Sequence, residues 1–115
     1  MKLPARVTLS KNATDKLRLV RTRTGLTPNI TARIAIMLAV KDGKSISNAS
    51  VGDTDGQVLN RDVLFGEHAD VYQAMLTQYA HDNKIDTSPQ TLVAALVEIG
   101  AFKLGHVKKL QDLVF

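Results

Sequence analysis

Residues 22–40 read Thr-Arg-Thr-Gly-Leu-Thr-Pro-Asn-Ile-Thr-Ala-Arg-Ile-Ala-Ile-Met-Leu-Ala-Val, and this stretch decides the fold class. Gly25 ends one helix, because glycine readily adopts the left-handed conformation of a helix C-cap. Thr27 followed by Pro28 begins the next helix, with Thr27 as the N-cap and Pro28 at the first helical position. The run from Ile30 to Val40 is apolar almost all the way round, so it must be covered on every side. We expect it to be the central core helix or a helix shared with another subunit.

Upstream, residues 6–10 alternate polar and apolar side chains, which predicts a short strand with Val7 and Leu9 on its buried side. Ser10 or Asn12 then caps a helix whose inner stripe is Ala13, Leu17, Val20 and Thr24. This order of strand, basic helix and capped helix is similar to the start of a ribbon-helix-helix module, in which strands of two copies pair antiparallel across a twofold axis. Ordinary α+β domains produce the same order, so both architectures stay open at this point.

Residues 45–66 form a turn-rich segment, which we expect to pack against the rest because long structureless loops are unusual in small domains. Val51 and Val58 flank a segment predicted to be a hairpin or an ordered excursion. The Asp53-Thr54-Asp55-Gly56 sequence indicates a turn rather than a calcium loop, because the third acidic position and the distal Glu of such a loop are missing.

Residues 67–115 form a helical body. The spacing predicts a helix over 67–83 with Val71, Met75 or Leu76, and Tyr79 on one side. A second helix begins after Thr87-Ser88-Pro89 and runs to about Lys103, weakened by Gly100 and Gly105. A terminal apolar segment carries Val107, Leu110, Leu113 and Val114. The chain, 1–115, is therefore predicted to be a single, mainly α domain with a short N-terminal strand, of which residues 1–44 are the basic strand-helix-helix part.

The net charge of +4 hides a strong asymmetry along the chain. Residues 1–44 carry ten basic and two acidic side chains, whereas residues 45–115 carry five basic and nine acidic ones. A polyanion would bind the base-rich part, although basic residues that merely solvate a helix face are the ordinary alternative. On a helical wheel the cations of residues 11–24 flank the buried stripe and reach solvent. The candidate DNA-binding residues are Arg6, Lys11, Lys16, Arg18, Arg21 and Arg23.

Phosphate contacts are expected to dominate over base reading. The side chains of Thr8 and Ser10 are short, and Arg6 alone can distinguish few base edges. Free N–H groups at the start of the helix at Pro28 would add a phosphate anchor. Arg33 lies beside the core stripe, where it is either a further contact or a buried structural ion-pair partner.

The composition argues against several classes of function. The chain has no Cys, which removes disulfides, thiol nucleophiles and Cys-ligated metals, and it is compatible with a cytoplasmic location. The three His residues are not spaced as metal ligands, and no nucleotide-binding or nucleophile motif is present. We therefore expect no metal, no cofactor, no catalytic residues and no enzyme activity. We expect no membrane partner either, because the longest apolar stretch is about half of the roughly 20 residues that a span needs, and no signal peptide is recognised.

A family resemblance rests on the blocks Arg6-Val7-Thr8-Leu9-Ser10-Lys11-Asn12, Thr22-Arg23-Thr24-Gly25-Leu26-Thr27-Pro28-Asn29-Ile30, Ala32-Arg33-Ile34-Ala35 and the closing helix at 96–104. With these blocks the chain resembles the DndE family, the small subunits of bacterial DNA sulfur modification systems. The resemblance spans nearly the whole chain and is weakest over residues 45–66.

The resemblance implies a role in phosphorothioation, the replacement of a non-bridging phosphate oxygen of DNA by sulfur, in a restriction-modification setting. It implies a homotetramer that binds DNA, with a preference for nicked duplex, and that works with the other subunits of the sulfur modification complex. Two alternatives stay open: a ribbon-helix-helix repressor or antitoxin that reads an operator, and a scaffold whose ligands are only proteins.

Overall fold

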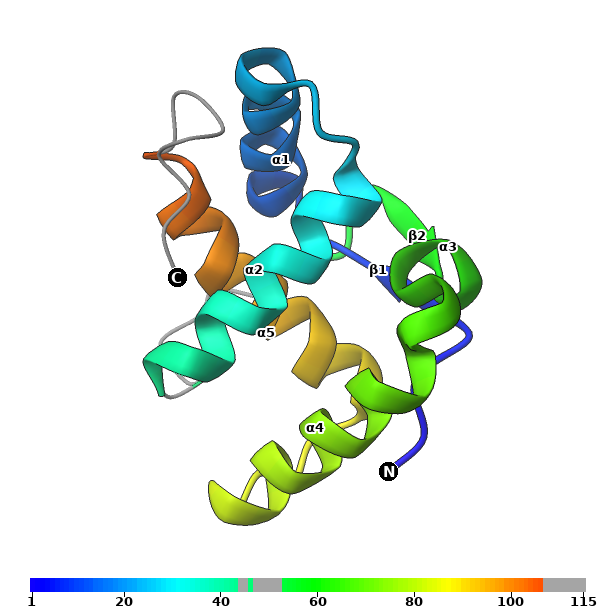
Figure 1. Cartoon of the computed structure of the whole chain (residues 1–115). Coiled ribbons are helices and arrows are strands. Elements are labelled where there is room, and N and C mark those ends of the chain that lie inside the picture. The colour runs from blue at the N-terminus through cyan, green and yellow to red at the C-terminus, as the bar shows by residue number, and fades with distance from the viewer. Residues whose placement is uncertain (44–45, 47–52, 107–115) are drawn as a thin grey trace.

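The computed structural model describes residues 1–43, 46 and 53–106 of the chain. In this part of the chain the expected mainly helical fold with a short N-terminal strand is confirmed (Figure 1). The elements in chain order are β1 (Arg6–Thr8), α1 (Lys11–Thr24), α2 (Pro28–Asp42), β2 (Val58–Asn60), α3 (Arg61–Phe65), the 3-10 turn η2 (Gly66–His68), α4 (Ala69–Asp82) and α5 (Pro89–Leu104). None of the helices in these ranges has the length and hydropathy that a membrane crossing requires.

Helix α5 is the central helix of the domain, and α2 lies across it (Figure 1). Every residue of α5 from Leu92 to Glu98 is buried, as are Ala101 and Leu104. Helix α2 is enclosed only on the side of Ala32, Ala35, Ile36 and Ala39, and Met37 is 47% exposed. Of the two alternatives, the central core helix is therefore wrong for α2; cover of its outer face by another subunit stays a prediction.

The two helices approach so closely that Gly100 has no room for a side chain. A Cβ placed there would lie 1.9 Å from the Ala35 carbonyl oxygen on α2. Gly100 therefore does not weaken α5 as its helix propensity suggests, because the glycine allows the contact that forms the centre of the core.

The predicted ends of α1 and the predicted starts of α2 and α5 are confirmed. The Ser10 side chain accepts a hydrogen bond from the Ala13 N–H at the start of α1, and Gly25 adopts a left-handed conformation, φ 79°, at its end. Thr27 precedes Pro28 at the start of α2, and Ser88 accepts a hydrogen bond from the Thr91 N–H at the start of α5. Local capping chemistry therefore sets these boundaries.

Strand β1 pairs with β2 of the same chain, antiparallel, with Val7 opposite Leu59. The other edge of β1 is also occupied: the Thr8 N–H donates to Oε1 of Gln90 at 3.0 Å, and Nε2 of Gln90 donates to the Thr8 carbonyl at 2.8 Å. A ribbon between two copies therefore does not form in the way that a ribbon-helix-helix dimer requires. Val7 and Leu9 are fully buried, as predicted.

Residues 53–66 pack against the domain, as expected for the turn-rich segment, but in a different form. Val58 belongs to β2 and lies opposite Thr8 rather than in a local hairpin, and α3 is a short helix that the sequence did not predict. Val51 lies outside the described residues. The same holds for the predicted terminal segment with Val107, Leu110, Leu113 and Val114.

Helix α4 begins two residues later than predicted, after the η2 turn, and buries Leu76 and Tyr79 of the predicted stripe but not Val71. The buried residues are Tyr72, Leu76 and Tyr79, whereas Val71 is 66% exposed. The expected position of Val71 on the inner side is therefore wrong. The aromatic ring of Tyr72 takes the inner position and packs 5.1 Å from that of Phe65 on α3.

Candidate nucleic-acid interface

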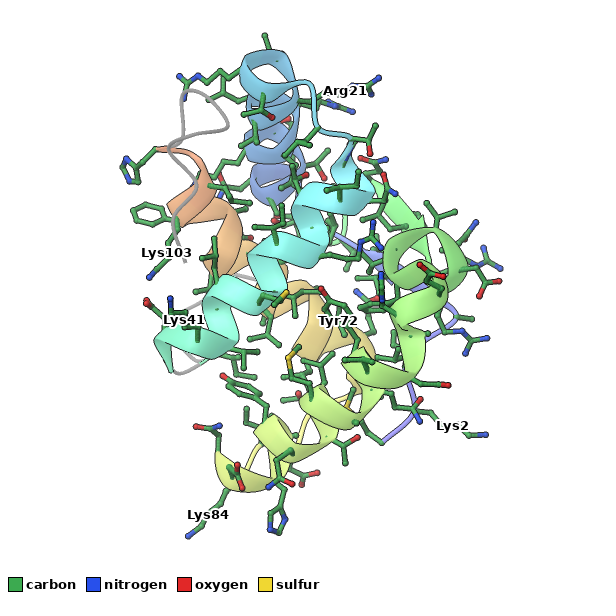
Figure 2. All side chains as sticks on the ribbon, viewed as in Figure 1. Lys2, Arg21, Lys41, Tyr72, Lys84 and Lys103 are labelled. Atoms are coloured by element: carbon green, nitrogen blue, oxygen red, sulfur yellow. The ribbon has the colours of Figure 1, made fainter. Side chains whose placement is uncertain are left out.

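Helix α1 carries its cations in two rows, one on each flank of its buried stripe, as the helical wheel predicts. Lys11, Arg18 and Arg21 form the row that faces α2 and residues 55–57. Lys16 and Arg23 form the other row, which faces the end of α5. Figure 2 shows Arg21 extending outward from the end of α1.

The first row borders a surface hollow of about 570 Å³. Lys11, Arg18 and Arg21 line it from α1, Pro28 lines it from the first turn of α2, and the two carboxylates at its border are Asp15 and Asp55. These charges leave the lining at +1, and Arg21 has no ion-pair partner in the described part of the chain.

Asp15 pairs with both of its neighbours on α1, at 3.3 Å from Nζ of Lys11 and 3.8 Å from a guanidinium nitrogen of Arg18. All three side chains are at least half exposed, so each pair contributes only about 0.3–0.5 kcal/mol. A phosphate can therefore replace Asp15 as the partner of these cations at little cost.

The second row is held by contacts with α5. Nζ of Lys16 lies 4.9 Å from the centre of the Phe102 ring, and Arg23 donates a hydrogen bond to the Gly105 carbonyl at 3.0 Å. These two residues therefore contribute to the packing of α1 on α5 as well as to the positive surface.

Arg6 lies apart from both rows, on the outward face of β1 and directly opposite Asn60. The structure thus places five of the six predicted residues on one helix and the sixth on the ribbon. Asn60 is a candidate that the sequence did not single out, because only the pairing of segments about fifty residues apart brings it beside Arg6.

A buried carboxylate fixes the start of α1. Glu98 on α5 accepts a hydrogen bond from the Ser10 hydroxyl at 2.5 Å and another from the Asn12 amide at 3.0 Å. Glu98 is 6% exposed, so the bond from Ser10 is buried, whereas the bond from the exposed Asn12 is only partly buried. The N-terminus of α1, and with it the first cationic row, is thereby tied to the core.

Residues 55–57 line the hollow on the other side, and the chain bends there at Gly56. The backbone N–H of Lys11, and next that of Asp55, donate to the Asp53 carboxylate and lower the pKa of Asp53 below its ordinary value. A Cβ on Gly56 would lie 2.2 Å from Oγ1 of Thr14, so the turn packs directly on α1.

Fewer backbone N–H groups than predicted are free to bind a phosphate at the start of α2. Pro28 has no N–H, and the Ile30 and Thr31 N–H groups both donate to the Thr27 carbonyl at 3.1 Å. The ion pair considered for Arg33 is not found among the described residues. Its guanidinium instead lies near Gly66, and its carbonyl accepts the Tyr72 hydroxyl at 3.4 Å.

Metal chemistry finds no support in the described residues, where no three His, Asp or Glu side chains gather as a ligand set.

Comparison with known proteins settles the family. The family model described as DNA sulphur modification protein DndE matches residues 6–111. The chain belongs to the DndE family. This family is implicated in DNA phosphorothioation, a form of DNA sulfur modification.

Two solved DndE structures are similar to the chain. The crystal structure of DndE from Escherichia coli B7A, involved in DNA phosphorothioation modification, is 30% identical with a TM-score of 0.70, over 86% of this chain and 96% of that one. A glycine-to-lysine double variant of DndE, involved in DNA phosphorothioation, is 29% identical with a TM-score of 0.70, over 89% of this chain and 98% of that one. A search of curated proteins found no match.

Proposed function

We propose that this chain is the DNA-binding accessory subunit of a phosphorothioation system, and that it holds duplex DNA, nicked duplex above all, through its backbone phosphates. The observation that carries the proposal is the row of Lys11, Arg18 and Arg21 along one hollow beside α1. Their only described ion-pair partner is the exposed Asp15. Cations spaced along a helix and available to solvent are suited to successive phosphates.

The proposed role excludes sulfur chemistry by this chain itself. Without a cysteine the chain cannot carry a persulfide, so other subunits of the system would transfer the sulfur. In this proposal the protein is a non-enzymatic, cytoplasmic subunit that binds DNA. The operator-reading repressor is less well supported, because β1 pairs within the chain.

The test of DNA binding is a gel-shift series with intact, nicked and single-stranded DNA of one sequence at two salt concentrations. We expect the nicked duplex to bind most tightly and the affinity to fall steeply with salt. In the variant Arg18→Glu with Arg21→Glu, binding is expected to be lost or, where residual, to show a salt slope lower by about 2, since each phosphate contact contributes about 0.9. Arg18 is preferred to Lys16 here because Lys16 packs on Phe102.

The matched control is Lys41→Glu with Lys84→Glu, which changes the net charge equally. Both lysines are exposed and lie far from Arg21, near the ends of α2 and α4 (Figure 2). The control is expected to keep most of the affinity. Equal loss in both variants would show that only net charge matters, and full binding by the Arg18/Arg21 variant would favour a scaffold that binds only proteins.

We further propose that the chain assembles as a homotetramer through the outer face of α2. On this face Ile34 and Leu38 are only partly buried, and Met37 is 47% exposed. An apolar helix face is therefore open to solvent in the single chain. Met37→Glu is expected to yield a smaller species by sedimentation velocity, whereas Leu19→Glu on α1 is expected to leave the assembly intact. Unchanged assembly in Met37→Glu would contradict this interface.

A further inference from the structure

The two-stranded ribbon of β1 and β2 has a buried face and an outward face. Val7 and Leu59 point into the core, with 0% and 4% exposure. Because side chains alternate along a strand, Arg6, Thr8, Val58 and Asn60 share the opposite face. Arg6, Asn60 and Val58 are exposed on it, the last at 49%.

Arg6 and Asn60 lie directly opposite each other on this face. The backbone bonds from Arg61 to Ala5 and from Leu9 to Gln57 flank the two strands and show that odd-numbered positions carry the hydrogen bonds of the ladder. Arg6 and Asn60 therefore form a non-hydrogen-bonded pair, in which the Cα atoms are about 4.5 Å apart and the side chains project from the same face.

Neither side chain is used by the fold. Asn60 stands at the N-cap of α3 but makes no side-chain cap bond, although capping is the usual task of an Asn in that position. Within residues 1–43, 46 and 53–106, neither the Arg6 guanidinium nor the Asn60 amide has a hydrogen-bond or ion-pair partner. Two groups with strong, directional donors are thus held side by side and left open to solvent.

These two residue types are the ones that read purines in the major groove. Arg pairs bidentately with O6 and N7 of guanine, Asn pairs with N6 and N7 of adenine, and apolar side chains such as Val contact the thymine methyl group. The groove, about 12 Å wide, admits a two-stranded ribbon. Gln90 keeps the ribbon at two strands, since its amide occupies the free edge of β1 at Thr8.

We propose that the outward face of this ribbon reads base edges in the major groove, with Arg6 selecting guanine and Asn60 selecting adenine at an adjacent base pair. The inference rests on the proposed DNA binding and adds sequence preference to it. Gln57 joins the two surfaces, because it directly precedes β2 and also lines the hollow beside α1. The cations of α1 would then hold phosphates while the ribbon reads bases.

The experiment selects duplexes from a randomised pool with the full chain and sequences the bound fraction. We expect enrichment of neighbouring G and A, with a loss of about 5- to 150-fold in affinity for a wrong base pair at either position. Arg6→Lys keeps the charge but loses the bidentate fork, so it should relax the guanine preference while the salt slope stays unchanged. Asn60→Ala should relax the adenine preference alone.

Arg18→Lys is the matched control, because a phosphate contact carries no base information and the enriched sequence should stay the same. Binding without any enriched sequence overturns base reading while the proposed DNA-holding function stands. A preference that survives both Arg6→Lys and Asn60→Ala also overturns it. Absence of all DNA binding by the unaltered chain overturns the proposed function and this inference together.

Discussion

The substitution Gly100→Ala tests the contact on which the fold depends. In an isolated helix this change stabilises by about 0.8–1.0 kcal/mol, because alanine has the higher helix propensity. In the structure the new Cβ would lie 1.9 Å from the oxygen, 2.3 Å from the carbon and 2.4 Å from the Cα of Ala35. All three are backbone atoms of α2, so no side-chain rotation relieves the overlap.

The magnitude follows from the required movement. Real Cβ atoms essentially never approach closer than 3.0 Å, so α2 and α5 must separate by roughly 1 Å at this point. A gap of that size forfeits about a quarter to a half of the dispersion energy of the facing atoms. Overpacking costs about 1–3 kcal/mol, and a backbone overlap belongs at the upper end of that range. After the gain in propensity, we expect a net destabilisation of about 2 kcal/mol, which corresponds to a fall in Tm of about 8–16 °C.

The assay is urea and thermal unfolding followed by circular dichroism at one fixed protein concentration, since the proposed assembly would make Tm depend on concentration. Gly105→Ala is the matched control. It lies just beyond α5 with φ −59°, and its Cβ would meet the carbonyl oxygens of Phe102 at 3.2 Å and Ala101 at 3.6 Å, so its effect should stay within about 0.5 kcal/mol. Adding Ala35→Gly should not rescue Gly100→Ala, because the overlap involves the backbone. A stabilised Gly100→Ala variant would refute the close approach of α2 and α5.

Three further changes probe the supports of the interface. Glu98→Ala leaves the buried Ser10 hydroxyl without its acceptor and should cost about 1–3 kcal/mol in urea unfolding, whereas Glu98→Gln should cost less. Gln90→Ala frees the N–H and carbonyl of Thr8, so hydrogen exchange at the Thr8 amide should quicken; unchanged protection would contradict this role. Burial raises the pKa of Tyr72 above its ordinary 10.0, so the folded state binds this proton more tightly than the unfolded state. Stability should therefore be full below pH 10 and fall as pH rises above it, and Tyr72→Phe should reduce the fall measured by alkaline unfolding.

Local chemistry carried most of the successful predictions about the fold. The caps at Ser10 and Gly25, and the Thr-Pro and Ser-Pro starts of α2 and α5, act through atoms within a few residues, so the sequence is sufficient to locate them. The exposure of the α1 cations follows in the same way from one helical wheel.

The errors concern contacts between segments far apart in the chain. Both α2 and α5 are strongly apolar, and composition cannot decide which of them is enclosed; the answer depends on the small residue Gly100 at their crossing. In α4 a shift of one position separates the exposed Val71 from the buried Tyr72, because the inner face is set by where Phe65 lies. Hydropathy alone contains neither piece of information.

The partner of β1 has the largest functional consequence. In a ribbon made by two chains, each chain supplies one strand, so the reading surface has twofold symmetry and favours a palindromic site. Here β2 supplies the second strand from the same chain, and Gln90 covers the opposite edge at Thr8. Each protomer thus carries a complete, asymmetric ribbon in which Arg6 stands on one strand and Asn60 on the other. Under the proposed function, an assembly of such chains would need no palindrome, and copies of the ribbon on different subunits would engage separate short sites while the α1 cations hold the intervening backbone.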